Sequence, residues 1–276
     1  MLDKIKRYHL FILTSFAVTV ALCVSRLILI LNNIEMDSLE NSAGLYYLDG
    51  SKAPVVFAVV CIAAGVLFLA GGVYFTKEIV ISKGVDSAIV HFASAINGLT
   101  LAAITLYFSY RLLFEKGSLG YKFLAITLLT AISAAYFLLI SSRRASKRFK
   151  TLVTVLSAVP VVLTAARLLF DFIERSLTVS ASSYSYHLVG LAFLMMFLCC
   201  EGRFNVGYRR KQLYVSLGLI TAMLLTVYSV PALYLSLFWP LEFTDITIYC
   251  AADLVMALYI YCRMLSVPKS KEEIEE

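Results

Sequence analysis

Residues 150–175 read KTLVTVLSAVPVVLTAARLLFDFIER, an apolar run of membrane length that ends in charged side chains. Arg167, Asp171 and Arg175 are spaced four residues apart, so a helix places them on one face with opposite signs adjacent. Glu174 lies beside this ladder. The stretch therefore predicts a membrane helix with charges gathered at one end.

A short string, Arg-Leu-(Leu/Ile)-(Leu/Phe), occurs at Arg26, Arg111 and Arg167. Each copy lies in the last third of an apolar segment. It would fit a duplicated helical hairpin, but leucine is so common in apolar helices that the string also arises by chance. The sequence leaves these two explanations open.

The composition of the chain is that of a membrane protein. Of its 276 residues, 61% are hydrophobic and 15% are charged, with a mean hydropathy of +0.85. A soluble domain has about a quarter of its residues charged. The formal net charge is +6, but the basic residues cluster in short loops between apolar runs. This pattern indicates an orienting role in the membrane and not nucleic-acid binding.

Eight apolar segments predict an all-α polytopic integral membrane protein, a bundle of eight transmembrane helices. Pro160 and Pro231 lie inside two of these segments and predict kinks there. The expected helices cover residues 9–31, 53–75, 88–114, 119–141, 150–172, 184–201, 211–237 and 243–265.

The loop charges predict the orientation. The N-terminus and loops 142–149 and 202–210 are basic, whereas loop 32–52 is acidic. The positive-inside rule and the even helix number both favour cytoplasmic N- and C-termini. We therefore expect one transmembrane domain over residues 1–265 and a charged cytoplasmic tail over 266–276.

The N-terminal segment has the basic start and apolar run of a secretory signal, but no small-x-small cleavage site follows. We interpret it as a retained first helix. The longest predicted loop, residues 32–52, leaves no room for a soluble ATPase, kinase or DNA-binding domain.

The motifs of common enzymes and metal sites are missing from the sequence. It contains no CxxC, HExxH, phosphate-binding loop or nucleophile elbow. The six cysteines fall inside predicted helices, and the three histidines fall on different helices. We expect no metal and no cofactor, and the enzyme class is disfavoured.

Arg26, Arg111 and Arg167 are the first candidate ligand-binding residues. The predicted topology places all three in the outer part of parallel helices, at one level of the membrane. They could face an outward cavity and bind an anion or carboxylate. The alternative is that they extend to the membrane surface or pair locally, as Arg167 with Asp171.

Asp253 is the deepest ionisable residue, near the middle of the last helix. Burying an isolated charged Asp at this depth costs at least about 2.5–3.5 kcal/mol, so we expect it to face the bundle, neutral or paired with Arg26 or Arg167. It could fix helix packing or couple a proton or cation. Glu201 is interpreted as an interfacial charge, and Asn97 as part of a thin polar stripe that bonds between helices.

Residues 26–56 carry Arg-Leu-Ile-Leu, an acidic loop, Gly44-Leu45-Tyr46-Tyr47, and Gly50-Ser51 before Pro54-Val55. This segment resembles uncharacterised multi-pass membrane proteins of clostridial bacteria. The resemblance implies a bacterial plasma membrane and carries over no activity and no site residues.

Three functions fit these observations. The first is a small-solute permease or its membrane subunit, with the three arginines as anion ligands and Asp253 as the coupling or counter-charge residue. The second is a scaffold or sensor subunit that acts through partner membrane proteins. The third is an enzyme acting on a lipid-borne substrate, with His187 or Asp171 at a lateral cleft. In all three the lipid bilayer is a partner and nucleic acid is not.

Overall fold

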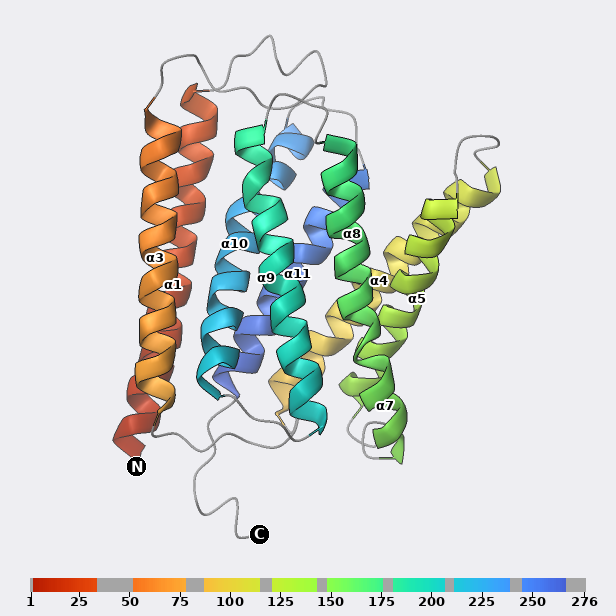
Figure 1. Ribbon diagram of the computed structural model, residues 1–276, viewed down its shortest axis with the longest axis horizontal. Coiled ribbons are helices and arrows are strands. Elements are labelled where there is room, and N and C mark those ends of the chain that lie inside the picture. Colours follow the sequence, from red (N-terminus) through yellow and green to blue (C-terminus); the bar gives the residue numbers. More distant parts are fainter. Residues whose placement is uncertain are drawn as a thin grey trace.

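The computed structural model describes residues 2–33, 52–77, 87–114, 121–142, 148–175, 181–206, 211–238 and 245–266. Every regular element in these ranges is a helix (Figure 1). The helices are α1 (Leu2–Asn33), α3 (Ala53–Thr76), α4 (Ala88–Phe114), α5 (Tyr121–Ser141), α7 (Lys150–Leu156), α8 (Val159–Arg175), α9 (Ala181–Val206), α10 (Lys211–Phe238) and α11 (Asp245–Leu265).

Within the described ranges, eight helical segments are long and apolar enough to cross a membrane, which confirms the predicted all-helical multi-pass class. Many large apolar side chains point outward from them, as lipid contact requires. On α3, the buried side chains form one stripe, and the opposite face is apolar too. Exposed examples are Leu13, Val55, Leu67, Phe92, Leu106 and Leu128.

The segment predicted over 150–172 is one membrane span in the structure, in which α7 ends at Leu156 and α8 begins at Val159. Pro160, in the first turn of α8, has no backbone N–H to continue the ladder from α7. The kink predicted at this proline is therefore confirmed as an interruption. Helix α10 continues through Pro231 to Phe238, and the kink expected there stays a prediction.

Helix α10 forms the centre of the bundle and packs against α1, α3, α9 and α11. Every residue from 214 to 225 is buried. Helices α4 and α5 pair with each other at one side of the bundle, and they join the rest through α11 and α8 (Figure 1). This arrangement surrounds the functional candidates on α8, α9 and α11 with protein.

The start of α1 and the end of α11 lie together at one end of the bundle (Figure 1). The Tyr8 hydroxyl donates to the Met264 carbonyl at 2.9 Å, and His9 Nε2 lies 3.0 Å from the Leu265 carbonyl oxygen. Most of the acidic loop 32–52, the tail beyond residue 266 and the side chains of Glu174 and Arg175 lie outside the described residues.

Candidate functional site

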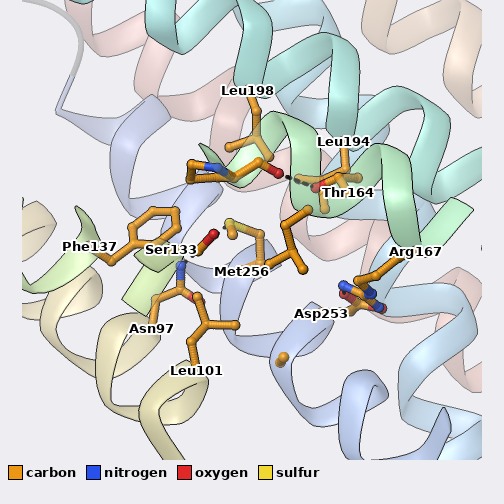
Figure 2. Close-up of a pocket in the computed structure, with 13 residues that line it drawn as sticks. Asn97, Leu101, Ser133, Phe137, Thr164, Arg167, Leu194, Leu198, Asp253 and Met256 are labelled. Atoms are coloured by element: carbon orange, nitrogen blue, oxygen red, sulfur yellow. Dashed lines mark hydrogen bonds and ion pairs between the residues drawn. The ribbon is translucent and has the colours of Figure 1, made fainter. Parts of the chain in front are cut away.

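Arg167 on α8 and Asp253 on α11 form a bidentate ion pair inside the bundle (Figure 2). The two terminal guanidinium nitrogens donate to the two carboxylate oxygens, each at 2.8 Å. Arg167 is 6% exposed and Asp253 is 1% exposed. The structure confirms Arg167 as a partner of Asp253, and Arg167 does not extend to the surface.

His187 on α9 lies between two carboxylates. Its Nε2 is 3.0 Å from Asp171 Oδ2, and its Nδ1 is 3.9 Å from Asp253 Oδ2. An ionised carboxylate only accepts hydrogen bonds, so His187 donates to Asp171 through Nε2. Asp171 lies one turn beyond Arg167, and this spacing lets α8 offer a cation to α11 and an anion to α9.

Aromatic rings connect Arg26 to these groups. The guanidinium carbon of Arg26 lies 4.1 Å from the centre of the Tyr186 ring, and Arg26 is only 1% exposed. It also lies 5.9 Å from the ring of Tyr228, which in turn packs on the His187 ring at 4.5 Å. Such cation–π contacts stabilise a buried guanidinium.

Tyr249 gives Arg167 the same kind of contact at 4.2 Å. Together, five of the six predicted ligand-binding residues gather in one region, which we call the Arg167–Asp253 cluster. Its members are Arg26, Arg167, Asp171, His187 and Asp253.

Arg111, the sixth predicted residue, is partly exposed and lies beside different aromatic rings. Its guanidinium carbon is 5.9 Å from the ring centre of Tyr107 and 5.8 Å from that of Phe123. Two of the three predicted arginines therefore belong to the cluster. The ligand-binding role of all six residues stays a prediction.

A small cavity of about 20 Å³ adjoins the Arg167–Asp253 pair, and apolar side chains form most of its wall (Figure 2). Asn97 from α4 and Ser133 from α5 line it together with the ion pair. Within the described part of the chain, Asn97 Oδ1, Ser133 Oγ and Arg167 Nε are buried without a hydrogen-bond partner. A volume of this size, with polar groups around it, accommodates one water molecule.

A second buried charge cluster joins α9, α10 and α11 near the end where α11 finishes. Arg263 Nε donates to Glu201 Oε1 and to the Tyr214 hydroxyl, each at 3.2 Å. Tyr214 and Tyr259 both donate to the Glu201 carboxylate. We call these four residues the Glu201–Arg263 cluster.

The interfacial interpretation of Glu201 is wrong, because this residue is 3% exposed and its carboxylate is held by three donors. Our sequence analysis did not identify Arg263 as its partner. The signal was present: the sixth and eighth predicted helices run in the same direction, and each carries one of the charges near the same end.

Among the described residues, no three His, Cys, Asp or Glu side chains are gathered to hold a metal ion. Comparison with protein-family models, with curated proteins and with solved structures finds no match. The site is therefore interpreted from its own chemistry.

Proposed function

We propose that this protein is a permease, or the membrane subunit of one, that binds a small anionic or carboxylate solute at the Arg167–Asp253 cluster. The observation that carries the proposal is the bidentate Arg167–Asp253 pair, buried inside the bundle beside a small cavity that Asn97 and Ser133 also line. Ionisable groups inside membrane helices are costly, and they mark solute and ion pathways in many membrane proteins.

The desolvation cost of burying these charged side chains supports a binding role for the cluster. Its ionisable side chains come from α1, α8, α9 and α11, and they meet where apolar residues would pack with less desolvation. A buried ion pair is often no more stabilising than an apolar pair of similar volume. Packing alone therefore gives little reason for so many charges in one place.

The ligand class follows from the two buried guanidinium groups. A guanidinium presents parallel N–H donors that match the oxygen pair of a carboxylate, as Asp253 already demonstrates at Arg167. An incoming carboxylate can take the same place, with Arg26 as a second cation in the cluster. Tyrosine rings next to both arginines leave the ligand a partly apolar surrounding.

For the location we propose a bacterial plasma membrane with both termini in the cytoplasm. The basic loops 142–149 and 202–210 and the basic N-terminus support this orientation. The start of α1 and the end of α11 lie on the same side of the bundle, as this orientation requires.

Thermal unfolding of the detergent-purified protein, with a panel of small anions, carboxylates and amines, tests the function. A ligand at 100 times its Kd should stabilise the fold by about 2.7 kcal/mol. We expect an anion or carboxylate to do so, and Arg167→Ala to abolish the effect. Arg203→Ala, which removes an exposed arginine on α9, is the matched control and should keep it.

A scaffold or sensor subunit is the second candidate, and the small cavity is the observation that favours it. A protein of this kind needs no solute site. If no member of the panel stabilised either wild type or Arg167→Ala, the result would contradict the permease proposal and support the scaffold. Stabilisation by amines alone would contradict the anion assignment.

A further inference from the structure

We infer that an anion bound at Arg167 enters together with one proton, which Asp253 accepts. This inference rests on the proposed function and adds the coupling ion to it. It is argued from the geometry of the ion pair, the burial of Asp253 and the unpartnered polar atoms of the adjacent cavity.

The first step is competition for Arg167. Both terminal nitrogens of its guanidinium already donate to Asp253, at 2.8 Å each. The remaining nitrogen, Nε, has one N–H and cannot hold a carboxylate in a bidentate manner. An anion that takes the bidentate place must therefore displace the Asp253 carboxylate.

The second step concerns the displaced carboxylate, which stays in a site that is 1% exposed. A buried carboxylate without a cation is strongly disfavoured, and such groups take up a proton instead. Arg167 from α8 and His187 from α9 lie within 4 Å of it, and Asp171 and Tyr249 lie next to these two partners.

Of these groups, Arg167 is then occupied by the anion. His187 bonds Asp171 through Nε2, and its Nδ1 is 3.9 Å from Asp253 Oδ2, beyond hydrogen-bond distance. The exchange is balanced. The Arg167–Asp253 pair, one anion and one proton give an Arg167–anion pair and a neutral Asp253. The net charge of the site does not change, so the site holds one anion and one proton without a new buried charge.

The cavity supplies the hydrogen bonds that the neutral acid needs. A protonated Asp253 has an O–H donor, whereas the ionised form only accepts. Asn97 Oδ1 is a fully buried acceptor without a donor, and it lines the same cavity as Asp253 (Figure 2). The cavity is also large enough for one water, which could carry the bond between the two side chains.

Methanesulfonate is a suitable probe, because it is the anion of a strong acid and brings no proton of its own. Its Kd would be measured by calorimetry on the whole protein across the neutral pH range. Uptake of one proton predicts about tenfold tighter binding for each unit by which the pH is lowered. Repeating the titration in buffers of different ionisation enthalpy counts the proton directly.

Asp253→Asn imitates the protonated acid and should bind methanesulfonate with no pH dependence, more tightly than wild type at high pH. Asp3→Asn removes an exposed carboxylate on α1 and should keep the wild-type dependence. If Asp253→Asn does not fold, the wild-type slope and the proton count still decide.

Three results would overturn the inference. Wild-type binding that does not change with pH would remove the proton, and the permease proposal would stand. A slope that persists in Asp253→Asn would assign the proton to another group. Absence of methanesulfonate binding would also overturn the inference, whereas stabilisation by another anion of the panel would keep the proposed function.

Discussion

Arg167 has its charge held in two ways, by the Asp253 carboxylate and by the face of the Tyr249 ring. Removing one member of a buried ion pair leaves the other charge without compensation, at a cost of about 3–5 kcal/mol. We therefore expect Arg167→Met or Asp253→Leu alone to lower the free energy of unfolding by this amount. Unfolding of the purified protein in one detergent measures it.

The double variant Arg167→Met/Asp253→Leu is the informative comparison. It removes both charges and fills the space with apolar atoms, so its stability should return close to that of wild type. Arg203→Ala, at the surface, should stay within about 0.5 kcal/mol of wild type. If the free energy of unfolding fell equally in the single and double variants, the loss would not come from an uncompensated charge.

Several residues of the Arg167–Asp253 cluster could be predicted because depth in a helix is visible in the sequence. A charge near the middle of an apolar segment, such as Asp253, must find a partner. The choice between Arg26 and Arg167 could not be predicted, because it depends on how α8 and α11 pack. Glu201 was misjudged since its segment was predicted to end at residue 201, whereas α9 continues to Val206.

At the scale of the helices, α3 and α10 approach closely at Gly72. A Cβ atom there would collide with Ser216 Oγ and lie 3.0 Å from Ser216 Cα. Gly72→Ala should force the two helices apart and lower the free energy of unfolding by about 1–3 kcal/mol. Thermal unfolding of the purified protein is the measurement.

Gly65→Ala on the same helix is the matched control. Its Cβ would meet its nearest neighbour, Met223 Cε, only at 4.0 Å, an ordinary contact distance. This variant should unfold at the same temperature as wild type or at a slightly higher one. A Gly72→Ala protein as stable as Gly65→Ala would contradict the close approach of α3 and α10.

The predicted segments correspond to the eight spans because hydrophobicity sets a span's length and place. The ends were predicted less well where a helix continues beyond its apolar part. Helix α1 begins at Leu2, in the charged segment before the expected start at residue 9. The break before Pro160 has a local cause, the missing backbone N–H of proline, so the proline in the sequence was enough to predict it.

For the whole molecule, we predict that both termini are cytoplasmic. Alkaline phosphatase, which is active only outside the cytoplasm, should be inactive when fused after residue 276 and active when inserted within residues 115–120. A fluorescent protein that folds only in the cytoplasm should give the opposite pattern. Activity of the C-terminal phosphatase fusion would reverse the orientation derived from the basic loops.

Helix packing across the molecule is the part that hydrophobicity does not predict. The central place of α10 was not foreseen, because lipid and protein surroundings are both apolar and favour the same residues. The cavity between α4, α5, α8, α9 and α11 depends on how five helices meet. The permease function is a proposal for the same reason: the sequence shows the charges but not the solute that they serve.

The contacts of Tyr8 and His9 with the last turn of α11 make the first and last helices of the bundle direct neighbours. The start of α1 and the end of α11 therefore lie at one face, and the described spans are even in number, so a linker could join these two helices without reversing any helix. The chain could then be opened in another loop as a circular permutant with the same packing. The fold is defined by which helices are neighbours and not by which of them is made first.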